Sequence, residues 1–345
     1  MKFVLSLIYI LIVLFKTGNV LSNENIFNVD NIEINKKITK NKEKLVDIAF
    51  KKAFLKLIDR ILLEKDYNTL SKTNIIQIKA LVSHYQILNS KENEEILKLN
   101  IAFDRDSLHK FFYSKNILYS DIINTEVIFF PLLIIDKEYF VYSKNYFYEN
   151  WNKENSSDLI QYTLPVESIE NLQIIEKYKE NIFNVDISNF FKEYDIDNMV
   201  FATIELNKNN SKIFLNTKIG GNNIKKTVKI ENVSTGQKEF NEEIIFRIKD
   251  LTKDLIKSQN LIDVRTPSFL NVKINLKNKN SLVEFDNRIK KIDLIDEFYV
   301  QQLNKNYVLV KIRYLGKISK IMNKFQDMNI RLNMIEGEWQ LNIIK

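Results

Sequence analysis

The chain of 345 residues contains no cysteine. This absence excludes disulfide bridges, cysteine nucleophiles, thiolate metal sites and a lipid-modified N-terminal cysteine. An exported eukaryotic protein of this size would usually contain disulfides, so the absence favours a bacterial origin.

Glycine and proline are scarce, with 6 and 3 residues, and the sequence has no glycine-rich phosphate loop and no Gly-x-Ser-x-Gly elbow. The pair Gly220-Gly221 lies between two predicted strands and is interpreted as a turn. Nucleotide-binding P-loop proteins and serine hydrolases of the elbow type are therefore disfavoured.

The two histidines, His84 and His109, each lack a second histidine or a cysteine at metal-ligand spacing. A structural or surface role is favoured for both. The acidic pair Asp104/Asp106 does not have the full spacing of a calcium loop, and we expect Asp106 to cap a helix instead. We predict no catalytic residues, no metal and no cofactor.

Long basic runs are also missing. The net charge is +7, both signs are interspersed, and the longest basic runs, such as Lys36-Lys37, are two residues long. Nucleic-acid binding is therefore not predicted. A weak attraction to an anionic membrane surface or a cell-wall polymer remains open.

A long apolar run is present at the N-terminus, where residues 3–15 follow Lys2. The run is shorter than the roughly 20 residues that a membrane-spanning helix needs. Val20 and Ser22 occupy the small-residue positions of a signal-peptidase site, so residues 1–22 are predicted to be a signal peptide cleaved near Ser22. The alternative is an uncleaved N-terminal inner-membrane anchor. Both predict a periplasmic or secreted protein.

The rest of the chain predicts an α+β fold of three small α/β-layered domains. Residues 23–118 form an N-terminal α+β domain, with strands at 26–34, 84–88 and 96–103 and helices at 41–63, 73–82 and 106–113. Residues 119–265 form a central α/β domain. Its near-continuous apolar run at 127–135 predicts a strand buried on both faces. Strands at 199–206, 211–219 and 224–233 and a helix at 239–258 follow.

Residues 266–345 show alternating strands and amphipathic helices in the order βαββαβ plus a short terminal strand. This order is that of ferredoxin-like domains. The fold itself carries no specific information about activity.

Short motifs across the mature chain resemble an uncharacterised bacterial envelope family, the domain of unknown function two-thousand-and-sixty-six. The motifs are AFKKAF at 49–54, FPLL at 130–133 with the aromatic segment 145–151, the Leu164-Pro165 step, Tyr194 ahead of a strand, and GEWQL at 337–341. The resemblance implies an exported proteobacterial protein. It brings no established activity or catalytic residues.

Residues 139–151 are densely aromatic, and two interpretations are open. The favoured one is that these rings cover the buried strand. The functional one is a recognition surface, because tyrosine and tryptophan are enriched at interfaces. The candidate binding residues are Tyr142, Tyr146, Tyr148 and Trp151.

Together these features predict an exported, non-enzymatic binding or accessory protein of the bacterial envelope, whose partner is an envelope protein or a glycan. One alternative is a carboxylate-dependent hydrolase of an envelope polymer, with acids drawn from Asp136, Glu138, Asp158 and Glu167. Another is a periplasmic small-ligand binder, which would need an enclosed apolar pocket of several hundred Å3.

Overall fold

The computed structural model describes residues 25–88, 95–153, 159–233, 236–276 and 281–344. The predicted signal peptide and Asp158 lie outside these residues. The chain is 38% helical and 36% strand, which confirms the α+β class. No helix in the described ranges has both the length and the apolar character needed to cross a membrane.

The chain divides into two compact units. Unit 1 comprises the described residues up to Leu57, then Lys72–Asn116 and the residues from Arg265 onward. Unit 2 comprises Ile58–Ser71 and Ile117–Val264. The boundary at residue 57 falls inside a helix, so the last turn of that helix belongs to unit 2.

The N-terminal part of unit 1 contains a three-stranded antiparallel sheet of order β1-β3-β2. Helices connect and follow these strands along the chain. Its elements are β1 (Asn28–Asn35), η1 (Lys36–Ile38), α2 (Lys42–Ile61), α4 (Ile75–Leu81), β2 (Val82–Leu88), β3 (Ile96–Phe103) and α5 (Arg105–Lys115). Ala49, Ala53 and Leu57 recur on one face of α2 and are fully buried, as the helical periodicity predicts.

The residue that caps the N-terminus of α5 differs from the one predicted from the sequence. Asp106 was expected to cap this helix, but the capping residue is Asp104, whose side chain accepts a hydrogen bond from the Ser107 amide. The amide and hydroxyl of Ser107 hold the pKa of Asp104 below its usual value. The prediction was wrong because the helix begins at Arg105, so its N-cap position lies two residues before Asp106.

The C-terminal part of unit 1 is a five-stranded sheet of order β13-β14-β12-β16-β15. Its elements are β12 (Ser268–Asn275), α9 (Ser281–Ile289), β13 (Ile295–Leu303), β14 (Tyr307–Tyr314), α10 (Ile318–Asp327), β15 (Ile330–Ile335) and β16 (Glu338–Ile343). Strand β14 is antiparallel to both β12 and β13, and β16 is parallel to β12.

Unit 2 is built on a sheet of order β10-β9-β8-β5-β6, with β7 also paired to β5. Besides the short helix α3 (Glu64–Leu70), its elements are β4 (Tyr119–Ser120), β5 (Thr125–Ile135), β6 (Glu138–Phe140), η2 (Tyr142–Lys144), α6 (Tyr146–Asn150), β7 (Ile160–Thr163), α7 (Ile169–Lys177), η3 (Lys179–Asn184), η4 (Ile187–Phe190), β8 (Met199–Leu206), β9 (Asn210–Ile219), β10 (Asn222–Glu231), α8 (Gln237–Ser258) and β11 (Leu261–Ile262).

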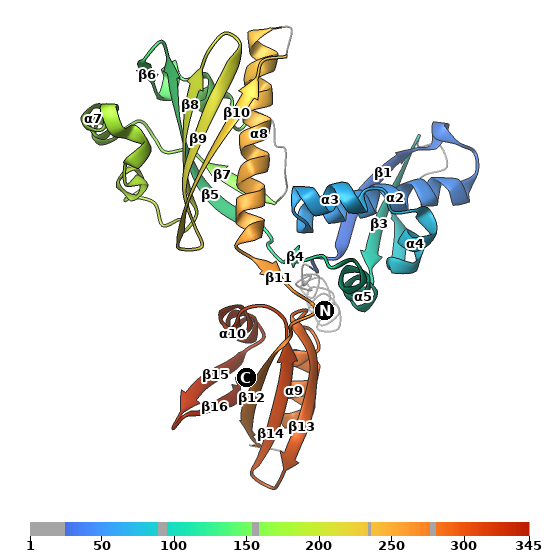
Figure 1. Cartoon of the computed structure of the whole chain (residues 1–345). Helices are drawn as coiled ribbons and strands as arrows, with labels where there is room; N and C mark the ends of the chain where they lie inside the picture. The colour runs from blue at the N-terminus through green and yellow to red at the C-terminus, as the bar shows by residue number, and fades with distance from the viewer. Residues whose placement is uncertain (1–24, 89–94, 154–158, 234–235, 277–280, 345) are drawn as a thin grey trace, which may run out of the picture. The chain divides into compact units, whose positions relative to one another are not determined.

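Strand β5 is buried on both faces, as its continuous apolar run predicts. Val127, Phe129 and Leu133 pack into one core with α8, while Ile128, Phe130 and Leu132 pack into a second core with α7 and the short 3-10 helices. In Figure 1, α8 and α7 accordingly lie on opposite sides of the sheet. Strand β5 is therefore the middle layer of unit 2.

A gap in strand pairing explains why a central strand tolerates Pro131. Along one edge of β5, β7 pairs with residues 125–128 and β6 pairs with residues 133–135, and no described strand covers the residues between. The buried side chain of Asn145 fills this gap and donates hydrogen bonds to the carbonyl oxygens of Pro131 (2.9 Å) and Phe140 (3.1 Å). Proline removes a ladder donor, which costs nothing where no strand pairs.

Candidate functional site

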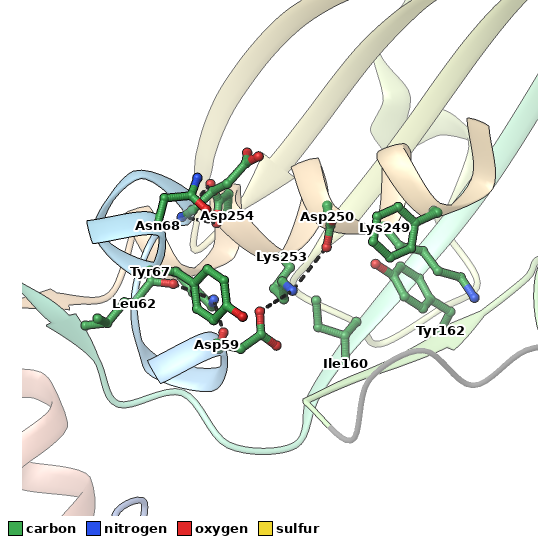
Figure 2. Close-up of a pocket in the computed structure, with 13 residues that line it drawn as sticks. Asp59, Leu62, Tyr67, Asn68, Ile160, Tyr162, Lys249, Asp250, Lys253 and Asp254 are labelled. Carbon is green, nitrogen blue, oxygen red and sulfur yellow. Dashed lines mark hydrogen bonds and ion pairs between the residues drawn. The ribbon is translucent and has the colours of Figure 1, made fainter. Parts of the chain in front are cut away.

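Helix α8 lines two cavities in unit 2. The first, the α3–α8 cavity, has a volume of about 370 Å3 and lies between α8, strand β7 and the segment from the last turn of α2 through α3 (Figure 2). Its lining is unusually rich in charge, with acids Asp59, Glu64, Asp250 and Asp254 and lysines Lys249, Lys253 and Lys257. Whether these groups are available for chemistry depends on their partners.

Lys253 bridges two of these acids. Its Nζ lies 3.1 Å from Asp59 Oδ1 and 3.1 Å from Asp250 Oδ1, as the dashed lines of Figure 2 mark. Burial alone would lower the pKa of Lys253, but the two carboxylates outweigh it and raise the pKa above its ordinary value. The bridge keeps Lys253 charged and both acids paired.

Lys257 binds the carbonyl groups at the C-terminal end of α2. Its Nζ donates hydrogen bonds to the carbonyl oxygens of Asp59 and Leu62 (2.6 Å to Leu62). The last carbonyls of a helix have no partner within the helix, and a cation there is also favoured by the helix dipole. Burial lowers the pKa of Lys257 to about 8.

Asp254 caps the N-terminus of α3 by accepting a hydrogen bond from its first backbone amide. The Glu64 amide donates to both carboxylate oxygens at 3.3 Å, and the N-cap residue Leu63 has no side chain that could accept this bond. Arg247 Nη1 lies 3.4 Å from Glu64 Oε1. Burial raises the pKa of Asp254. We call Lys253, Asp254 and Lys257 the α8 network, and each member has a structural partner.

The second cavity, the α6–α8 cavity, has a volume of about 440 Å3. Three rings and three lysines line it together with one glutamate, one asparagine and one isoleucine: Tyr146, Trp151, Phe246, Lys153, Lys238, Lys249, Glu242, Asn150 and Ile245. Both cavities are lined by aromatic rings, but among the described lining residues only the α6–α8 cavity has more lysines than acids.

Two residues line both cavities, Phe246 and Lys249. Phe246 is 58% exposed, which is uncommon for a phenylalanine on a helix that otherwise buries its apolar side chains. Lys249 is 8% exposed, and its Nζ lies 5.3 Å from the ring centre of Trp151 and 6.0 Å from that of Tyr162. The electron-rich ring faces stabilise this cation.

The structure separates the four aromatic residues singled out in the sequence. Tyr142 is 4% exposed, and its hydroxyl accepts hydrogen bonds from the Ser168 amide (3.3 Å) and Asn171 Nδ2 (3.1 Å). The Tyr148 hydroxyl donates to the Pro165 carbonyl at 2.7 Å. These two rings belong to the core on the α7 side of β5.

Tyr146 and Trp151 belong to the core on the α8 side and line the α6–α8 cavity. Trp151 is fully buried and stacks on Phe129, with ring centres 3.6 Å apart, so packing is its first role. Its indole Nε1 is buried and has no hydrogen-bond partner in the described part of the chain.

The acids proposed from the sequence do not gather at either cavity. Asp136, Glu138 and Glu167 are exposed and line neither one, and Asp158 lies outside the described residues. Among the described residues, no group of three histidine, cysteine or acidic side chains is arranged to hold a metal ion.

Sequence reasoning missed the contribution of α8. Its lysines at 249, 253 and 257 recur every four residues, as do Asp250 and Asp254, so each set shares one side of the helix. This regular spacing was a usable signal. The exposed Phe246 gave none, because its position on the helix is consistent with an ordinary surface residue.

Comparison with known proteins adds no relative: no family model matches the chain, and no curated protein matches it. The resemblance to an envelope family therefore stays a prediction, and function must be argued from the cavities themselves.

Proposed function

We propose that this chain is an exported, non-enzymatic binding or accessory protein of the bacterial envelope, periplasmic or secreted after its leader is removed. The signal-peptide pattern and the short motifs that resemble an envelope family support export, and the absence of cysteine supports a bacterial origin. The proposed partner is an envelope protein or a glycan. Weak contact with an anionic membrane surface or wall polymer fits the net charge, and nucleic acid is not a proposed partner because the longest basic runs are two residues long.

The observation that carries the proposal is the α6–α8 cavity. Its volume of about 440 Å3 lies within the roughly 300–1,000 Å3 of small-molecule sites. Tyr146 and Phe246 supply aromatic contact area there, and Lys153 and Lys238 supply exposed cations. A binding site of this kind needs no reactive group, which suits a chain without a nucleophile motif.

The test uses a photoreactive phenylalanine analogue at Phe246 in a C-terminally tagged copy produced in the native bacterium. A matched control carries the analogue at Phe269, which is 52% exposed on β12 and lines neither cavity. We expect a discrete crosslinked envelope component from position 246 that is missing from position 269. Identical products at both positions, or no product at 246, would overturn the proposal.

A carboxylate hydrolase is the second candidate, because acids do converge in the α3–α8 cavity and burial raises the pKa of one of them, Asp254. It ranks second because Asp254, Asp59 and Asp250 each have a partner that accounts for their position.

Hydrolysis can be tested by incubating the purified protein with cell-wall polymer and measuring released fragments. A hydrolase would lose at least a hundredfold in rate on Asp254→Asn or Asp250→Asn and nothing on Asp195→Asn, an exposed acid outside the cavity. The binding proposal expects no release from the unmodified protein.

We also propose the finer domain division, with three small α/β domains and a ferredoxin-like end. Support for the last domain comes from its topology: β12 and β13 run parallel with β14 between them, which is a split βαβ unit with α9 as the crossover. The final hairpin is a variation, since β16 lies between β12 and β15.

A further inference from the structure

We propose that the α6–α8 cavity binds a carboxylated sugar ring, such as a uronic acid unit of an envelope polysaccharide. This inference rests on the proposed binding function and assigns a ligand class to the same cavity. Charge and aromatic surface each contribute to it.

Charge selects an acidic ligand. Lys153, Lys238 and Lys249 line the cavity, while Glu242 is the one carboxylate among its described lining residues. The pairing of that glutamate is long, with Lys238 Nζ 3.7 Å from Glu242 Oε1, and Lys153 Nζ donates to an amide oxygen, Asn150 Oδ1, at 2.8 Å. A carboxylate placed between Lys153 and Lys238 would form charge-assisted hydrogen bonds, which are roughly twice as strong as neutral ones.

Aromatic surface selects a ring over a simple acid. Tyr146 on α6 and the exposed Phe246 on α8 contribute rings to the lining, while the ring of Trp151 is buried beneath them in the core. The faces of aromatic rings carry partial negative charge, and the C–H groups of a pyranose ring carry partial positive charge, so the two stack favourably. Acetate or another small acid gains nothing from these rings.

The test is a fluorescence titration of the mature protein carrying Trp339→Phe. The chain has two tryptophans, so Trp151 becomes the reporter within the cavity. The ligands are D-glucuronate, D-glucose, acetate and a galacturonate trimer. We expect saturable changes with glucuronate, binding at least tenfold weaker for glucose and acetate, and binding by the trimer at least as tight as by the monomer if the source is a polymer.

Paired variants separate the cavity from general charge. Lys153→Gln with Lys238→Gln should weaken glucuronate binding at least tenfold, whereas Lys212→Gln with Lys226→Gln, two exposed lysines outside both cavities, should leave it unchanged. Equal affinity for glucose and glucuronate, equal affinity for acetate, or an equal loss in both variants would overturn the ligand class. A discrete crosslink from position 246 with no uronate binding would overturn the ligand class and leave the binding function standing.

Discussion

Asn145 shows how one side chain can hold the centre of a unit together. Its Nδ2 donates to the carbonyls of Pro131 and Phe140 across the pairing gap of β5, and its Oδ1 accepts the Phe147 amide at the start of α6. Few other side chains offer two donors and an acceptor in so small a volume. The gap, the proline and the helix start therefore depend on the same residue.

We expect Asn145→Leu to lower the free energy of unfolding by about 2–4 kcal/mol, because two buried carbonyls lose their donor and α6 loses its cap. Urea denaturation followed by circular dichroism measures the change. Asn152→Leu is the control, since Asn152 is exposed and its bond to the Tyr162 carbonyl is long at 3.4 Å. A loss no larger than that of the control would contradict the role given to Asn145.

His109 should make stability sensitive to acid. Burial lowers its pKa from 6.5 to about 4, and its ring packs edge-on against Phe27 with centres 5.8 Å apart. Between these pH values the unfolded chain binds a proton that the folded chain does not. The stability that depends on a neutral His109 is therefore fully present above pH 6.5. As the pH falls towards 4, the free energy of unfolding decreases by up to roughly 3 kcal/mol.

The measurement compares the pH dependence of unfolding in His109→Gln and His84→Gln. The first variant should flatten the decline between pH 6.5 and 4, while the second, at an exposed position, should keep it. Parallel curves for the two variants would refute the assignment. The sequence placed His109 on a short helix, but its burial required the tertiary structure.

At the scale of elements, regular apolar periodicity predicted strands and helices well, but a short polar helix was missed. The continuous apolar run of β5 and the apolar stripe of α8 predicted both elements and their burial. Helix α3 was missed because it is seven residues long, largely polar, and capped by Asp254 from a helix about 190 positions away. No local pattern contains that information.

The candidate site was predictable to a similar extent. Tyr146 and Trp151 were selected for their residue type, and both line the α6–α8 cavity. Tyr142 and Tyr148 have the same residue type and a similar position in the sequence, yet they pack on the opposite side of β5. The path of the chain through η2 and α6 decides the face, and composition does not encode it.

We expect Lys257→Met to lower the free energy of unfolding by about 2–4 kcal/mol, because the carbonyls of Asp59 and Leu62 lose their shared donor. Lys238→Met, at the exposed N-terminal end of the same helix, should change it by less than about 1 kcal/mol. Chemical denaturation of both variants decides the matter. Similar losses of stability in the two variants would show that the hydrogen bonds of Lys257 do not stabilise the C-terminal end of α2.

At the scale of the whole molecule, the proposed signal peptide can be tested directly. Production in a Gram-negative host should yield a periplasmic protein whose N-terminal residue is Asn23, determined by intact mass and N-terminal sequencing. Ser22→Phe removes the small residue next to the cleavage site and should leave a longer, membrane-associated form. An unprocessed wild-type protein would instead favour the N-terminal anchor.

The proposed C-terminal domain can be tested as a fragment. Residues 266–345 contain a five-stranded sheet with a buried apolar face that includes Val272, Val310 and Ile312. If this stretch is a domain, the isolated fragment should unfold cooperatively on heating and give dispersed amide resonances. A fragment that unfolds gradually would favour its dependence on the rest of unit 1.

The central strand pair of unit 2 has a consequence for timing. Strand β5 lies parallel to β8, and the paired residues Ile128 and Met199 are separated by roughly seventy positions along the chain. This pair cannot form until a long loop closes, whereas β8, β9 and β10 can form as successive local hairpins. During this interval β5 should lack its β8 partner and pair only locally, with β6 at residues 133–135. Such a delay would suit the export that we propose, because a segment that has not yet folded can still be threaded through a membrane channel.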